Sequence, residues 1–82
     1  MGDSMNRLQL KALLSSVMME IKHGAPITRN AIGVKNQYKK MVGLPKNASN
    51  MTVLQTLGGT YADNGLAHEF KTFVRKFGFQ VD

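Results

Sequence analysis

The fold of this 82-residue chain is decided first by the stretch from Met5 to Gly24, which has the sequence MNRLQLKALLSSVMMEIKHG. Its most apolar residues recur with helical spacing, at Leu10, Leu13, Leu14, Val17 and Ile21. This spacing places them on one side of an α-helix, so the sequence predicts an amphipathic helix over residues 5–23. Asp3 or Ser4 can cap its first turn, and Gly24 stands where a left-handed residue commonly ends a helix.

Two more long helices have the same kind of pattern. The second is predicted over residues 28–42, with Gly43 as its stop. The last is predicted over residues 64–77, where Asp63 or Asn64 can cap the first turn. Its apolar stripe consists of Leu66, Phe70, Phe73, Val74 and Phe77. This stripe is the clearest helical signal in the second half of the chain.

A shorter element lies between these helices, at residues 51–57. A strand competes with a helix here, because Thr52 and Val53 favour strands. The apolar positions fit helical spacing better than strict alternation, with Asn50 as the cap and Gly58-Gly59 as the stop. We therefore expect an all-α fold, a compact bundle of three longer helices (about 5–23, 28–42 and 64–77) plus one short helix (about 51–57).

Composition limits the class of protein. The chain is long enough for one small domain, and its hydrophobic share of 43% is ordinary for a globular protein. We expect residues 5–82 to form that domain, with residues 1–4 as an expression leader or a disordered N-terminus. There is no cysteine, which excludes disulfides and thiolate chemistry and favours a reducing compartment, so we expect a cytoplasmic protein. No apolar run approaches the roughly 20 residues of a membrane span.

The net charge of +6 is concentrated in the middle of the chain. Between Ile21 and Ala62 there is no aspartate or glutamate, but there are six basic residues, Lys22, Arg29, Lys35, Lys39, Lys40 and Lys46. A field of one sign attracts polyanions or an acidic protein surface.

The second predicted helix carries most of these cations. A turn of 100° per residue places Arg29, Asn36 and Lys40 together, opposite the apolar stripe of Ile27, Val34 and Tyr38. Lys35 and Lys39 lie on the adjoining flank. Lysine and arginine can bind phosphates, and asparagine can bind phosphate, sugar or base edges. The predicted nucleic-acid-binding residues are therefore Arg29, Lys35, Asn36, Lys39, Lys40 and Lys46. The alternative interpretation is a solvated face that keeps a small protein soluble.

The first predicted helix has a second apolar face. Met5, Leu8, Ala12 and Met19 project opposite the main stripe, which is typical of a central helix or of one shared with a partner. Methionine suits adaptable contact surfaces, but it also fills gaps in cores. These four residues are the predicted partner interface, and a homodimer formed through them would enlarge a marginal core.

The sequence contains no pattern typical of catalysis. His23 and His68 are far apart, and His68-Glu69 lacks the spacing of a zinc-binding helix. We predict no catalytic residues, no metal site, no cofactor and no small-molecule substrate, and therefore a protein that is not an enzyme.

Two functions fit these observations best. The first is a small, basic, intracellular protein that binds DNA or RNA through a lysine- and arginine-rich helix face. The second is a regulatory or inhibitory protein that binds an acidic surface of a larger protein. A basic helix lying on an anionic membrane fits less well, because the apolar stripe of that helix is needed for the core.

Overall fold

In the computed structural model, residues 5–24 and 29–78 can be described, and they form four α-helices and no strand. The helices are α1 (Arg7–His23), α2 (Arg29–Val42), α3 (Asn50–Asp63) and α4 (Ala67–Lys76). The expected all-α bundle is confirmed. The predicted leader at residues 1–4 lies outside the described residues.

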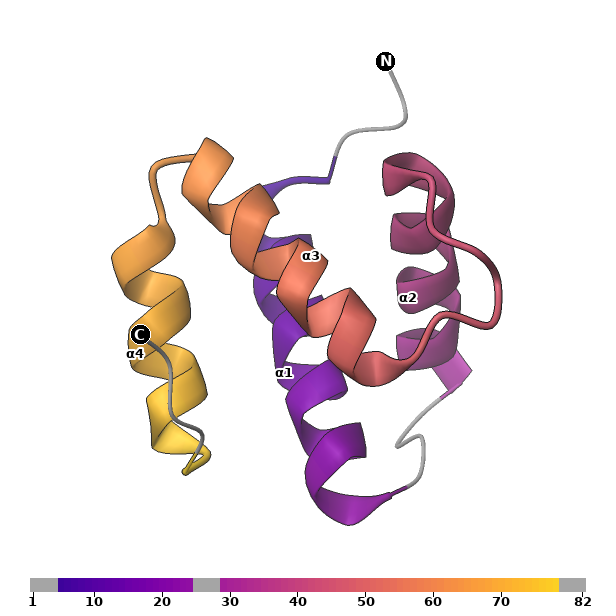
Figure 1. The fold of residues 1–82 in the computed structure, drawn as a ribbon, viewed down its shortest axis with the longest axis horizontal. Helices are drawn as coiled ribbons and strands as arrows, with labels where there is room; N and C mark the ends of the chain where they lie inside the picture. The colour runs from indigo at the N-terminus through magenta and orange to yellow at the C-terminus, as the bar shows by residue number, and fades with distance from the viewer. Residues whose placement is uncertain (1–4, 25–28, 79–82) are drawn as a thin grey trace.

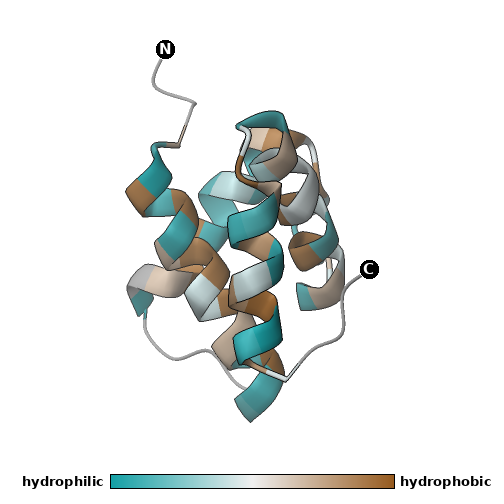
Figure 2. Cartoon of the chain, turned by 90° about the vertical axis from the view of Figure 1, so that its left-hand side faces the viewer, coloured by the Kyte–Doolittle hydropathy of each residue, from teal (hydrophilic) through white to brown (hydrophobic). Residues whose placement is uncertain are grey.

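The four helices form a small bundle around α1 and α3. In Figure 1, α3 crosses in front of α1, with α2 on one side of this pair and α4 on the other. Helix α1 packs against α2 and α3, and α3 also packs against α4. Each helix carries both apolar and polar residues (Figure 2), as expected for helices with one face in a core.

The core is built from the predicted stripe of α1 and from apolar residues of the other three helices. Leu13, Leu14 and Val17 are buried, and Ile21 packs at the edge of the same cluster. Opposite them lie the buried side chains Tyr38, Val53, Leu54, Leu57, Tyr61, Phe70 and Val74. All four helices therefore share one hydrophobic core, as the chain length suggests.

The ends of α1 follow ordinary capping chemistry, with one change from the prediction. Asn6, rather than Asp3 or Ser4, is the N-cap, because its Oδ1 accepts a hydrogen bond of 2.8 Å from the Gln9 backbone N–H. The Gln9 side chain accepts one of 3.0 Å from the Asn6 N–H in return, which completes a capping box. At the other end, Gly24 adopts φ 79°, the left-handed conformation predicted from its position.

The third helix is longer than predicted, because it does not end at Gly58-Gly59. It starts after the N-cap Ser49 and continues to Asp63. The buried residues Leu57 and Tyr61 extend its apolar stripe beyond the glycines, so packing outweighs the roughly 0.5–1 kcal/mol that each mid-helix glycine costs.

The last helix is correspondingly shorter than the predicted 64–77. Asn64 ends α3 instead of capping α4, and Gly65 turns the chain at φ 73°. Leu66 takes the N-cap position without a side-chain hydrogen bond. The short helix of the bundle is therefore α4. None of the helices described is long and apolar enough to cross a membrane.

Candidate cationic interface

Lys35 lies between three helices rather than on the solvent-facing flank of α2. Its ammonium donates hydrogen bonds to both carboxylate oxygens of Glu20, at 2.9 and 3.0 Å, and to Asn50 Oδ1 at 3.0 Å. Glu20 is buried, and only 11% of the Lys35 side chain is exposed. Lys35 is thus bound inside the fold and has no free donor surface to offer a phosphate.

Lys39 is also inside the fold. It is buried, and its ammonium donates a hydrogen bond of 2.9 Å to the backbone carbonyl of Lys46. Burial lowers the pKa of Lys39, and the nearby charge of Lys35 lowers it further, against a smaller opposing effect of Glu20. Lys39 therefore fastens the loop after α2 to that helix.

The other four predicted nucleic-acid-binding residues are exposed. They are Arg29, Asn36, Lys40 and Lys46. Asn36, Lys40 and Lys46 line one shallow groove of about 170 Å³ between α2 and the following loop, with Lys39 and Leu44 as its other lining residues. We call these four exposed residues the α2 patch.

Few acidic groups remain unpaired on the described residues. Of the three carboxylates on described residues, Glu20 is buried with Lys35, and Glu69 is paired with Arg7 at the surface. Within the described ranges only Asp63 remains as an unpaired acid. The basic residues that are at least partly exposed there and make no ion pair are Lys11, Lys22, Arg29, Lys40, Lys46, Lys71, Arg75 and Lys76. The resulting surface field is strongly positive.

Only part of the predicted partner interface on α1 is exposed in the structure. Leu8 is 76% exposed and Ala12 is exposed as well. Met19 is half-buried, and Met5 packs against the core cluster instead of projecting away from it. Leu8 and Ala12 are therefore the two residues of this set that lie open on the outer face.

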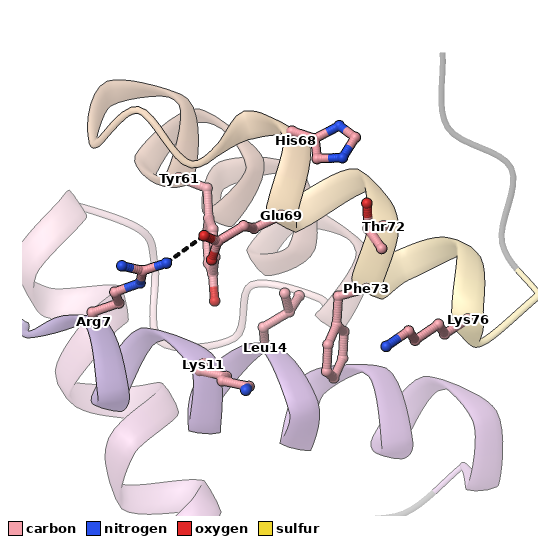
Figure 3. A pocket seen from close by; sticks show the side chains of 9 residues that line it. All are labelled: Arg7, Lys11, Leu14, Tyr61, His68, Glu69, Thr72, Phe73 and Lys76. Carbon is pink, nitrogen blue, oxygen red and sulfur yellow. Dashed lines mark hydrogen bonds and ion pairs between the residues drawn. The ribbon is translucent and has the colours of Figure 1, made fainter.

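A larger groove, which sequence reasoning missed, lies between α1 and α4. Its volume is about 280 Å³, and Figure 3 shows the nine side chains that line it. Leu14, Tyr61 and Phe73 form its inner surface, and Lys11 and Lys76 are among the residues at its rim. Burial raises the pKa of the Tyr61 phenol, and the charge of Glu69 adds to this, while Arg7 acts in the opposite direction. The sequence offered one signal, the cations beside the phenylalanine stripe of the last helix, but it did not show which other helix they face.

No cluster that could hold a metal ion is found among the described residues, where no three histidine or acidic side chains gather. Comparison with known proteins gives no further guide to the site. No protein-family model matches this chain, and no curated protein or solved structure is significantly similar to it.

Proposed function

We propose that this chain is a non-enzymatic protein of the cytoplasm that binds nucleic acid through its positively charged surface. The observation that carries the proposal is the excess of exposed cations, since Glu20 and Glu69 are held in ion pairs and Asp63 is the one unpaired acid on the described residues. What remains around the described surface is an excess of cations without partners, the electrostatic feature that phosphate backbones recognise.

The α2 patch is the proposed contact surface. Lys40 and Lys46 supply phosphate contacts at the groove, and Arg29 supplies one more on the same helix. Asn36, between them, can donate to phosphate or to a base edge. With so few groups able to read a base, the binding is expected to depend strongly on salt and weakly on sequence.

The test is a fluorescence-anisotropy titration of labelled duplex DNA and of single-stranded RNA between about 50 and 200 mM salt. Replacing two phosphate contacts with the Lys40→Gln/Lys46→Gln variant should reduce the slope of log affinity against log salt by about 1.8 for duplex DNA and about 1.4 for a single strand. The strand that binds more tightly identifies the class of nucleic acid.

The control variant loses the same two positive charges at a different place on the surface. Lys71→Gln/Arg75→Gln removes two cations from α4 and should leave the slope nearly unchanged. An equal effect of the two variants would reject the α2 patch as the contact surface. Failure of the wild-type chain to bind either nucleic acid at low salt would reject the function.

A second candidate function is binding to a larger protein as a regulator. One observation favours it, the 76% exposure of Leu8 on the outer face of α1, beside exposed Ala12. In this second candidate function, Leu8 and Ala12 supply the apolar contact to the partner, which can be a second copy of the chain. Leu8→Glu should weaken such an association without destabilising the monomer, as measured by sedimentation equilibrium and urea unfolding.

A further inference from the structure

The groove between α1 and α4 combines an apolar interior with charged walls. Leu14 extends into it from α1 and Phe73 from α4, and Tyr61 of α3 lines it on the side of Glu69 (Figure 3). Its volume of about 280 Å³ is just below that of ligand pockets, which commonly measure about 300–1,000 Å³. It is therefore suited to a single apolar side chain rather than to a whole cofactor.

The polar groups around this groove are mostly donors. Lys11 and Lys76 are exposed and, in the part of the chain that the structure describes, neither forms an ion pair. Figure 3 shows the Lys76 ammonium turned back toward Phe73, and Lys11 on the α1 side of the groove. These two cations flank the apolar interior, so a carboxylate next to an inserted side chain would meet a positive charge.

The Tyr61 hydroxyl adds a donor inside the groove. The Tyr61 residue is only 4% exposed, and Figure 3 shows its hydroxyl pointing from α3 toward α1. Among the described residues this hydroxyl makes no hydrogen bond, although the other buried tyrosine, Tyr38, bonds Thr60 at 2.6 Å. No fully buried side-chain oxygen among the described residues lacks a partner, so the Tyr61 hydroxyl reaches solvent in the groove and is free to donate to a group that enters it.

We propose that the groove between α1 and α4 binds an acidic peptide segment of a partner protein, which inserts one apolar side chain between Leu14 and Phe73. Carboxylates beside that side chain accept from Lys11, Lys76 and the Tyr61 hydroxyl. The proposal concerns a different face from the α2 patch and does not rest on nucleic-acid binding.

A peptide fits this groove better than a nucleic acid does. Glu69 lies on its wall with one oxygen bonded to Arg7, so the groove offers a hydrogen-bond acceptor as well as its cations. A peptide has backbone N–H groups that can donate to Glu69 as well as carboxylates that accept from the lysines. The aromatic rings are also unsuited to stacking on bases, because Tyr61 is only 4% exposed and Phe73 is half-buried, so neither ring has an open face.

The test uses the full chain and three labelled pools of short peptides. The first pool has a central leucine or phenylalanine flanked by aspartate and glutamate. The second replaces every acid by its amide, and the third replaces the central residue by alanine. Fluorescence anisotropy should detect binding of the first pool, with at least tenfold weaker binding of the other two. In the ¹⁵N–¹H spectrum, the first pool should shift the amides of Leu14, Thr72 and Phe73.

Two variants address the groove directly. Lys11→Glu/Lys76→Glu reverses two exposed charges and should weaken binding of the acidic pool at least tenfold. Tyr61→Phe keeps the ring and should weaken it about tenfold, the value of one hydrogen bond to a charged group. The matched control, Lys40→Glu/Lys46→Glu on the α2 patch, should bind the pool with unchanged affinity.

The proposal is overturned if the acidic pool does not bind, or if the amide pool binds equally well. It is also overturned if the groove variants bind like the wild type, or if they weaken nucleic acid instead of the peptide. Binding that only the α2-patch control abolishes would likewise reject the groove, and it would leave the nucleic-acid measurements to decide the function of that patch.

Discussion

Lys35 and Glu20 form an ion pair in the interior of the bundle, where the lysine ammonium lies 2.9 and 3.0 Å from the two carboxylate oxygens. Asn50 completes the arrangement by accepting from the same ammonium at 3.0 Å. Glu20 belongs to α1, Lys35 to α2, and Asn50 is the first residue of α3. A buried charge that loses its partner is much more costly than an exposed one, because no water replaces the lost interaction.

Removal of either partner should therefore destabilise the fold severely. We expect Lys35→Met or Glu20→Leu to lower the free energy of unfolding by about 3–5 kcal/mol. The double variant should lose much less than the sum, since it leaves no unpaired charge. Urea unfolding of the four proteins measures this coupling. The exposed Arg7–Glu69 pair is the control, and Arg7→Met should cost no more than about 1 kcal/mol.

Lys39 should make the stability depend on pH. Its pKa is lowered in the folded chain from the ordinary value of 10.5, mainly by burial. Between the lowered pKa and 10.5 the unfolded chain binds more protons than the folded chain, so the free energy of unfolding rises with pH in this range. A Lys39→Met variant should lack the rise, whereas Lys40→Met, at an exposed position, should keep it.

This measurement should stay below about pH 9, where tyrosines remain mostly protonated in both states. Burial raises the pKa of Tyr38 and of Tyr61, so above their ordinary value of 10.0 the unfolded chain loses protons first and stability falls. Identical pH profiles for the wild type and Lys39→Met would show that the buried ammonium has no such effect.

The two adjacent glycines of α3 should respond differently to alanine. A Cβ at Gly59 would meet no atom within 4 Å, so Gly59→Ala should raise the free energy of unfolding by about 0.5–1 kcal/mol. At Gly58 the new Cβ would lie 3.2 and 3.3 Å from Cε2 and Cζ of Phe70. Gly58→Ala should consequently be less stable than Gly59→Ala, and a Phe70→Leu background should reduce that difference. Equal effects in thermal unfolding would show that the ring moves without cost.

The hydrogen bond between Tyr38 and Thr60 gives a further prediction. The two hydroxyl oxygens lie 2.6 Å apart, and Thr60 Oγ1 also lies 3.3 Å from the Thr56 carbonyl oxygen. Tyr38→Phe should lower the free energy of unfolding by about 0.5–1.5 kcal/mol. The control is Tyr61→Phe, whose lost hydroxyl makes no hydrogen bond within the described residues, and its stability should change little.

Much of the fold could be predicted from local pattern. The stripe of α1 and the left-handed Gly24 were both apparent in the sequence, since helical spacing and glycine at a helix end are local signals. The predicted end of α3, at residue 57, was wrong for a physical reason. Gly58 and Gly59 are typical helix stops. The helix continues past them because Leu57 and Tyr61, on either side, are buried in the core.

The candidate site was harder to predict, because exposure depends on contacts between distant residues. Helical geometry placed Lys35 and Lys39 beside Lys40, but the partner of Lys35 is Glu20, fifteen positions earlier on another helix. The acceptor for Lys39 is a backbone carbonyl, which any residue type provides. The groove between α1 and α4 was missed for the same reason, since its walls are more than fifty positions apart.

The Lys35 ammonium, which is bonded to two other helices, also determines which part of the native protein unfolds locally. Because one nitrogen joins α1, α2 and the start of α3, none of these three can separate without breaking the same buried contacts. Helix α4 enters the core through Phe70 and Val74 and is joined to α1 by a surface ion pair. Local unfolding should therefore release α4 alone, and its backbone amides should exchange with deuterium well before those in the middle of α1.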